Sequence, residues 1–560
     1  MAVDVAIEIT GVDGIDKKML IDGLSISTYP SDANTNNELI ERLAGKGVKE
    51  ITTALQTFGY YEPLVNYSVR TVDKKLSVNY QVTLGKPVIV QLIDIVITGD
   101  GMADTVLLKW KSDFPLKTGE RLNQLKYEDA KRELMRILHN RGYFKQQFLQ
   151  RAINVDTQAK IASIIIRLDT GARHHYGEIQ FTQGEDVFDQ NYLKNFISFD
   201  SGGEFETSDL IESQQHFAMS DEFQSVEVEP LLNKIENEQV PIAIRLNPKK
   251  PNKYELGAGY ATDTGPRIFA SIERRQVTRT GHRAKANIQL SKVKSLINAS
   301  YRIPLTKPYS DYMMFSGERK SEDTDTVVSQ TNTMSLDTTY ALANWLRTIS
   351  FSYLREHYEL NNDEVKDSKL LIPGITFEYV HEKPQDKNRF NWQFNVGLKG
   401  ADTSVVSDTS FAQANMYAWL RFPLTTESRL VNYTKLGYSW TSEFKELPAS
   451  QRYFTGGDYT IRGYTYNSLG PVDANNVLIG GEELFVTSLE FQHRIGVDLY
   501  GNVFYDFGNA FNKNDFVAKS GAGVGVGWGF PFGSLHLYAA SALSDEGNPW
   551  RLHLTVGAEL

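Results

Sequence analysis

The chain has no cysteine, which excludes disulfides, thiolate metal ligands and a cysteine nucleophile. It has no run of about 18 apolar residues, so the sequence predicts no transmembrane helix. It has no basic block, and its formal net charge of -10 argues against a nucleic-acid-binding protein. A transmembrane β-barrel stays possible, because its strands place apolar residues only at alternate positions.

Motifs of common catalytic sites are also lacking. His381 is followed by Glu382, but no second histidine completes a zinc-protease motif. The pair His174 and His175 is more typical of a solvated turn than of a metal site, and no G-x-S-x-G elbow is present. We therefore expect a protein that is not an enzyme, with no catalytic residue, no metal site and no cofactor.

The first part of the chain contains a repeat. A short strand and a glycine turn recur three times, with the turn glycines at Gly11, Gly99 and Gly184, which gives a unit of about 85 residues. Helical sequence follows in each unit, and in the second unit Leu134 and Leu138 recur at helical spacing. Each unit then closes on two strands, so the expected order is strand, helix, helix, strand, strand.

The sequence thus predicts three α+β domains at 1–87, 88–174 and 175–251, in a chain of 560 residues that exceeds one core. A small sheet covered by two helices on one face leaves a strand edge to which another extended chain can pair. Spacing and peptide binding stay equally open as roles for these domains. No signal-peptide pattern precedes Val3, and we expect the numbering to begin at a mature N-terminus.

From Asn252 onward the apolar period changes to two. About sixteen runs of roughly ten residues fill 252–560, a pattern typical of a transmembrane barrel. In GAGVGVGWGF, every odd position from Gly521 to Gly529 is glycine, and the even positions are apolar. No βαβ context makes this run a dinucleotide-binding motif. We expect its bare inner face to admit close approach by something inside the barrel.

The first and last strands of this barrel must pair to close it. Their residues of interest are Tyr254, Leu256, Gly257 and Gly259 in the first strand and Leu554 and Gly557 in the last. Glycines on both sides predict a weaker pairing than elsewhere, a candidate lateral seam. The alternative, that small residues only ease barrel curvature, stays open.

The longest segment without alternation in the barrel half is 442–480. Its central stretch contributes Gly456, Gly457, Asp458, Ile461, Arg462, Gly463 and Tyr464. Its many aromatic residues indicate that it folds against something, and the inner barrel wall is the available surface. A buried Arg462 needs carboxylate partners, and strand parity points Glu490 and Asp506 inward.

Ile461 to Tyr464 reads IRGY and resembles the signature of the outer-membrane assembly and two-partner-secretion superfamily. FTGGDYTIRGY, ELGAGYATDTGPR from Glu255 and the three repeats add to this resemblance. It implies three POTRA-like β-α-α-β-β units followed by a 16-stranded antiparallel transmembrane β-barrel in the bacterial outer membrane, with the repeats in the periplasm. It also implies a loop folded into the lumen, Arg462 paired with inner-wall acids, and a lateral gate between the first and last strands.

The leading functional hypothesis is an insertase that assembles client β-barrel proteins such as autotransporters by pairing their strands at the seam. The repeats would bind unfolded outer-membrane clients or an inner-membrane-anchored partner. A two-partner-type pore that passes a polypeptide through the lumen is the first alternative, and its loop must be able to leave the lumen. A passive porin is the second, although it would not need the repeats.

Overall fold

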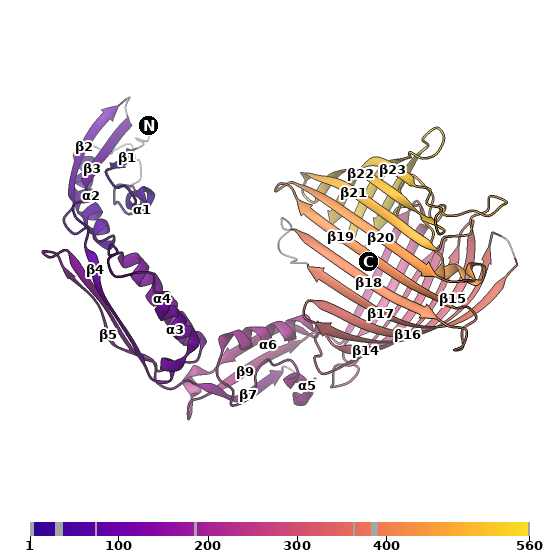
Figure 1. Cartoon of the computed structure of the whole chain (residues 1–560), viewed down its shortest axis with the longest axis horizontal. Helices are drawn as coiled ribbons and strands as arrows, with labels where there is room; N and C mark the ends of the chain where they lie inside the picture. The colour runs from indigo at the N-terminus through magenta and orange to yellow at the C-terminus, as the bar shows by residue number, and fades with distance from the viewer. Residues whose placement is uncertain are drawn as a thin grey trace. The chain divides into compact units, whose positions relative to one another are not determined.

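The computed structural model describes residues 5–27, 37–72, 75–183, 187–361, 364–381, 390–531 and 533–557. Three small sheets are followed by a closed barrel, as expected from the sequence (Figure 1). The turn glycine Gly184, Glu382 and Leu560 lie outside the described residues. The chain divides into two compact units, and the second unit contains the barrel together with 182–197 and 214–226 of the third repeat.

The three repeats share one element order and one sheet topology. The first consists of β1 (Val5–Thr10), α1 (Lys17–Asp22), α2 (Asn37–Thr57), β2 (Leu64–Val72) and β3 (Lys75–Thr83). The second consists of β4 (Ile89–Thr98), α3 (Thr105–Ser112), α4 (Gln124–Asn140), β5 (Gln147–Asp156) and β6 (Ile161–Asp169), with a 3-10 turn at Asp100–Ala103. The third consists of β7 (His175–Gln183), α5 (Gln190–Lys194), α6 (Thr207–Met219), β8 (Phe223–Pro230) and β9 (Gln239–Pro248), with a 3-10 turn at Leu232–Lys234.

In each repeat the last strand of the unit lies in the middle of the sheet. The strand orders are β1-β3-β2, β4-β6-β5 and β7-β9-β8. The helices cover one face, and in the second repeat Leu134 and Leu138 of α4 are fully buried against the sheet (Figure 1). Within each sheet β2, β5 and β8 are therefore edge strands, the kind of edge to which another extended chain can pair.

A left-handed residue leads from the second helix of each repeat into the next strand. Gly59 has φ 84° and Gly142 has φ 77° in the first two repeats. The third repeat has Asp221 there, with φ 56°. Aspartate tolerates this conformation better than most residues with a side chain, which explains why an acidic corner can replace a glycine corner.

The barrel is closed by sixteen antiparallel strands (Figure 1). They are β10 (Asn252–Ala261), β11 (Gly265–Arg274), β12 (Arg283–Ser291), β13 (Lys294–Pro304), β14 (Tyr312–Asp323), β15 (Val327–Leu342), β16 (Trp345–Leu360), β17 (Lys366–His381), β18 (Asn391–Ala401), β19 (Phe411–Pro423), β20 (Ser428–Trp440), β21 (Glu483–Gly496), β22 (Leu499–Phe511), β23 (Lys519–Phe530), β24 (Gly533–Ala542) and β25 (Trp550–Gly557). Of the helices in the described residues, none is both long and apolar enough to cross a membrane.

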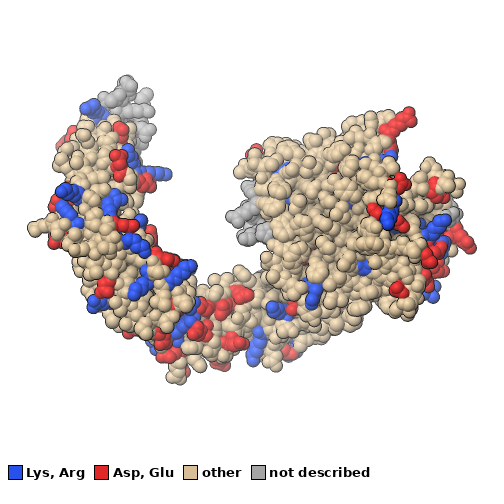
Figure 2. Space-filling view, viewed as in Figure 1, with Lys and Arg blue, Asp and Glu red and all other residues tan. Residues whose placement is uncertain are grey.

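Outward positions of the barrel strands carry exposed apolar side chains. Leu256 is 84% exposed, Met334 is 73% exposed and Leu552 is 64% exposed. Figure 2 shows a broad uncharged wall on the visible face of the barrel, with charged residues gathered toward its rims. This pattern is what a strand wall in contact with lipid requires.

The long segment between β20 and β21 spans 441–482 and is called the lumen loop below. It holds two 3-10 turns, Phe444–Glu446 and Ala449–Gln451. Isolated bridges join Tyr453 to Gly481 and Thr455 to Leu469, so the loop is a folded element. Its Ile461 is fully buried in a cluster with Val486 of β21 and Ala542 of β24, which places it against the inner wall of the barrel.

Candidate functional site

Arg462 lies at the centre of the lumen loop and is 4% exposed. Its Nη1 donates to Glu490 Oε2 at 2.7 Å, and its Nε and Nη2 donate to the two carboxylate oxygens of Asp506 at 2.8 Å each. Its backbone N–H also donates to Asp506 Oδ2 at 2.9 Å. Glu490 comes from β21 and Asp506 from β22, so one guanidinium joins the loop to two strands through a bidentate and a single charge-assisted contact.

Aromatic rings cover the same guanidinium. The centre of the Phe504 ring lies 3.4 Å from Arg462 Cζ, and the centre of the Tyr538 ring lies 4.8 Å away. Ser488 accepts a further hydrogen bond from Nη2 at 3.1 Å. The rings thus shield the ion pairs from water. Loss of one partner of such a shielded pair would leave a buried charge unpaired.

The glycine row of β23 explains how the loop reaches the wall. A Cβ on Gly521 would lie 1.9 Å from the carbonyl oxygen of Arg462. Such a distance is impossible for real atoms, so only a glycine at 521 admits the loop backbone. Gly463, with φ 99°, approaches the β24 backbone in the same way, because its Cβ would lie 2.9 Å from Ala542 N.

The remaining residues of the loop motif surround these contacts. Gly456 and Gly457 both have φ 101°, a region open mainly to glycine. Tyr464 is 5% exposed and its hydroxyl lies 3.4 Å from the Ser520 carbonyl oxygen.

Asp458 forms a second anchor of the loop, on the last strand. One of its carboxylate oxygens accepts a hydrogen bond from Nδ1 of His553, and the other accepts from Thr555 Oγ1 at 3.2 Å. Both partners belong to β25. The backbone N–H of Asp458 donates to Asp263 Oδ2 at 2.7 Å, in the turn between β10 and β11. One loop residue therefore contacts both ends of the barrel sheet.

The hydrogen bonds of His553 define its protonation. Its Nε2 accepts from the backbone N–H of Gly463 at 2.9 Å, so that nitrogen carries no proton. The proton then resides on Nδ1, which donates to Asp458. His553 thus joins the two anchors, since Gly463 follows Arg462 directly.

Asp263, Asp458 and His553 lie close enough to hold a metal ion. The contacts favour a network of hydrogen bonds and one ion pair instead, because Nδ1 of His553 donates its proton to Asp458 and Arg551 Nη2 lies 3.6 Å from Asp263 Oδ1. Burial, and then the negative charge of Asp458, raise the pKa of the Asp263 carboxyl to about 6. The folded protein therefore favours the protonated form of Asp263 in the turn between β10 and β11.

The seam, defined as the junction of β10 with β25, is short. Within the described residues only Tyr260 pairs with Val556 and Ala261 with Thr555, and Thr262 N–H donates to the Leu554 carbonyl at 3.0 Å. In contrast, β10 pairs with β11 along its whole length, from Asn252 to Ala261. Backbone pairing at the seam is thus a small part of what a barrel strand normally makes.

The structure places the expected seam residues in two groups. Gly259, Leu554 and Gly557 lie at the junction, and a Cβ on Gly259 would be 2.5 Å from the Val556 carbonyl oxygen. Tyr254, Leu256 and Gly257 pair with β11 and have no partner on β25 among the described residues. Tyr254 and Leu256 point outward and are 68% and 84% exposed, so the lower half of β10 is an edge strand.

Sequence reasoning missed several contributors to this site. Nothing in the sequence assigns His553 and Thr555 of the last strand to Asp458, or Asp263 of the β10–β11 turn to the same loop residue. One signal could have found them. The loop motif contains an acid, Asp458, that needs a partner when buried, and the last strand carries His553 and Thr555 on its inward face.

A family model described as the Omp85 superfamily domain matches residues 278–559, just over half of the chain. The chain belongs to the Omp85 superfamily. Models described as POTRA domain TamA domain 1 and as POTRA, surface antigen variable number repeat, match residues 6–84 and 91–171. The protein is therefore an outer-membrane β-barrel with periplasmic POTRA domains.

Individual relatives are distant. The outer membrane protein assembly factor BamA of Neisseria meningitidis serogroup B is 19% identical over 471 residues, which are 78% of this chain and 58% of the relative. The chain thus spans 58% of that relative's length. BamA from Haemophilus ducreyi lacking POTRA domains 1-3 is 17% identical with a TM-score of 0.66, over 84% of this chain and 99% of that structure.

CdiB from Escherichia coli is 11% identical with a TM-score of 0.52, over 93% of this chain and 98% of that structure. At these identities the two solved structures show a shared fold. What each relative does is a property of that relative, and the role of this chain has to be argued from its own residues.

Proposed function

We propose that the chain is a TamA-type insertase, which assembles client outer-membrane β-barrel proteins such as autotransporters at its seam. The observation that carries this proposal is the contrast between the two seam pairs found among the described residues and a fully paired β10–β11 hairpin. An unpaired backbone group costs several kcal/mol in lipid. An edge strand in the barrel wall therefore offers a client strand the pairing that lipid denies it.

The lumen loop would hold this junction between clients. Asp458 contacts the β10–β11 turn and β25 together, while Arg462 joins the loop to β21 and β22. The closed state thus rests on side-chain contacts from the loop more than on backbone pairing at the seam. Separation of β10 from β25 would expose an edge without unfolding the rest of the barrel.

The POTRA repeats supply the periplasmic half of the proposal. Their edge strands β2, β5 and β8 suit addition of an extended segment. We propose that they bind unfolded clients and an inner-membrane-anchored, TamB-like partner. The match of residues 6–84 to a TamA-type POTRA model supports this assignment. No covalent chemistry is part of the proposal, and client folding would supply the driving force.

A reversible cross-link across the seam tests the function. Tyr260→Cys with Val556→Cys joins a paired position that points away from the loop anchors. The matched control is Ala258→Cys with Ile268→Cys, a paired position between β10 and β11. The cysteine-free chain makes both disulfides unambiguous.

We expect the oxidised seam pair to stop assembly of an autotransporter barrel in reconstituted vesicles, and reduction to restore it. The control pair should have no effect in either state. Full client assembly by the oxidised seam pair would refute the insertase. Polypeptide passage through the lumen that persists with the seam closed would favour a secretion pore instead.

A further inference from the structure

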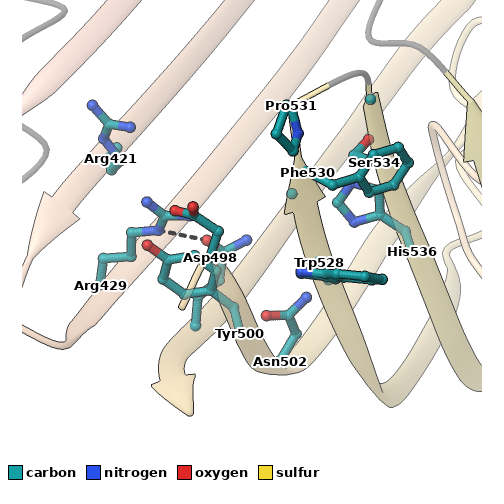
Figure 3. Close-up of a pocket in the computed structure, with 14 residues that line it drawn as sticks. Arg421, Arg429, Asp498, Tyr500, Asn502, Trp528, Phe530, Pro531, Ser534 and His536 are labelled. Atoms are coloured by element: carbon teal, nitrogen blue, oxygen red, sulfur yellow. Dashed lines mark hydrogen bonds between the residues drawn. The ribbon is translucent and has the colours of Figure 1, made fainter. Parts of the chain in front are cut away.

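A second feature of the lumen is a pocket that the loop does not fill. Its volume is about 700 Å³, and it is lined by residues of β19, β20, β21, β22, β23 and β24. Strands β20, β22 and β24 begin at this end of the barrel, as β10 does. Figure 3 shows Arg421 and Arg429 on one side of the pocket and Ser534 with His536 across from them. The pocket therefore lies at the periplasmic mouth of the lumen.

The glycine row of β23 runs from the loop to this pocket. Gly521 is covered by the Arg462 carbonyl oxygen, Gly523 by the Phe504 ring and Gly525 by the Tyr538 ring. A Cβ on Gly529 would meet nothing nearer than Asp498 at 3.9 Å. The lower end of the row is thus open backbone facing a cavity, and the loop does not account for the glycine there.

The pocket carries positive charge on one wall. Arg429 Nε donates to Gln492 Oε1 at 2.6 Å (Figure 3), and its guanidinium lies 4.3 Å from the centre of the Tyr500 ring. These contacts hold the side chain in place, while its Nη1 and Nη2 make no hydrogen bond to the described residues. Arg421, from β19, faces the same space, and Asp498 is the acid in the lining.

A buried amide lies beside the arginines. Asn502 is 4% exposed, and its Oδ1 accepts no hydrogen bond from the described residues. Buried amide oxygens usually have a donor. A ligand that brings an N–H group together with an anion would satisfy both Asn502 and Arg429.

We propose that this pocket binds a carboxylate carried by an extended polypeptide. Arginine binds carboxylates through two parallel N–H···O bonds, and the peptide N–H groups next to the carboxylate supply donors. The open backbone at Gly529, where a Cβ would meet nothing nearer than 3.9 Å, gives a peptide chain room against the wall. The inference rests on the proposed function, in which unfolded clients arrive from this side.

The position of the pocket fits a client on its way to the seam. Ser534, which lines the pocket at the start of β24, pairs with Gly557 of β25. A carboxylate bound by Arg429 would therefore hold a client within a few strands of the β10 edge. A terminal carboxylate and an Asp or Glu side chain offer the same chemistry, and the test has to separate them.

Peptide binding to the full-length protein in nanodiscs tests the pocket. The probe is a dye-labelled peptide of alternating threonine and valine with a free C-terminal carboxylate. Its partners are the same peptide as a C-terminal amide, and an amide with one internal glutamate. The variants are Arg429→Gln and Arg421→Gln, and Arg355→Gln, an exposed arginine of β16, is the matched control. Heat-modifiable migration checks that each barrel is folded.

We expect the free acid to bind wild type and Arg355→Gln equally, and Arg429→Gln about tenfold more weakly, the effect of one charge-assisted contact. The amide should bind wild type as weakly as the acid binds Arg429→Gln. Binding of the glutamate peptide would support the carboxylate site and assign it to side chains. Equal binding of acid and amide, or displacement of the acid by inorganic phosphate at similar concentration, would overturn the proposal.

Gly529→Leu gives a second readout that does not remove charge. Its side chain would occupy the open wall, so we expect weaker acid binding with a folded barrel. If the peptide does not bind while the oxidised 260–556 pair still stops client assembly, the pocket proposal alone is refuted. If the oxidised pair does not stop client assembly while binding stays specific for the free acid, the insertase proposal is refuted and the pocket proposal stands.

Discussion

At the scale of single residues, Arg462 carries the largest concentration of interactions in the lumen. It satisfies Glu490 and Asp506 together, and parity along β21 and β22 was enough to point both acids inward. The hydrogen-bond geometry, including the backbone N–H of Arg462 on Asp506, could not be predicted, because it depends on the path of the loop.

Arg462→Ala should loosen the loop while the barrel stays assembled. Two buried carboxylates would lose their cation, at a cost of about 3 to 5 kcal/mol for a broken buried pair. Limited proteolysis within 441–482 should become faster than in wild type. Lys435→Gln is the control: it removes an inward cation whose Nζ lies 3.4 Å from the Tyr459 carbonyl oxygen and 6.0 Å from the centre of the Tyr433 ring. Unchanged proteolysis of Arg462→Ala would contradict the role given to this ion pair.

The raised pKa of Asp263 predicts that the stability of the folded protein depends on pH. Its pKa is raised from 3.8 to about 6, so its protonated form is favoured in the folded protein. Its contribution to stability is therefore greatest below pH 3.8 and falls as the pH rises to about 6. Asp263→Asn keeps an acceptor for Asp458 N–H and removes the charge.

The difference in thermal stability between Asp263→Asn and wild type should accordingly grow in favour of the variant from pH 3.8 to about pH 6, then level off. Melting followed by tryptophan fluorescence across this range measures it. A difference that stays constant with pH would contradict a pKa of Asp263 raised by burial and by the charge of Asp458.

At the scale of elements, the lumen loop and β23 fit each other through one glycine. The sequence predicted that the inner face of GAGVGVGWGF admits a close approach. The structure shows the Arg462 carbonyl at Gly521. The alternation itself is the signal, since an inward glycine leaves the strand backbone open to close approach.

Gly521→Val should displace the loop as strongly as Arg462→Ala, because its Cβ would overlap the Arg462 carbonyl oxygen. Gly317→Val in β14 is the matched control, because a Cβ there meets nothing within 4 Å. Proteolysis of the loop measures both. Equal resistance of the two glycine variants would show that the loop does not rest on β23.

The junction of loop and last strand could not be predicted from sequence. Asp458 belongs to the motif named from the sequence, but no pattern there points to His553 or Thr555 as its partners. Their contact depends on which turn of the loop reaches β25. Long-range pairing of this kind, between residues about a hundred positions apart, has no local pattern in the sequence.

Asp458→Ala should weaken the seam itself. With His553 and Thr555 released, β25 would be held to β10 by two pairs and few further contacts. In a chain that carries Asp458→Ala together with cysteines at 260 and 556, disulfide formation should be slower or less complete than in a chain that carries the two cysteines and Asp458. Glu443→Gln, an exposed acid of the same loop, is the control. An unchanged rate would show that the loop does not stabilise the seam.

At the scale of the whole molecule, two periodicities were sufficient for the architecture. A strand and glycine turn that recur about every 85 residues marked the repeats, and alternation after Asn252 marked the barrel. The three small sheets and the closed barrel confirm both expectations. The extent of the seam was beyond sequence, because strand register at closure depends on the whole circumference. Glycines at 257, 259 and 557 pointed to a weak junction, and among the described residues Tyr260 pairs with Val556 and Ala261 with Thr555.

The central claim is that the lower half of β10, which pairs with β11 but with no described residue of β25, is the edge that receives client strands. A photoreactive residue in place of Tyr254, introduced during client assembly in vesicles, tests it most directly. The same residue in place of Phe351, which is exposed on the outer face of β16, is the control. The account expects cross-links to a client strand at 254 and none at 351, whereas equal labelling at both positions, or none at 254 while assembly proceeds, would contradict it.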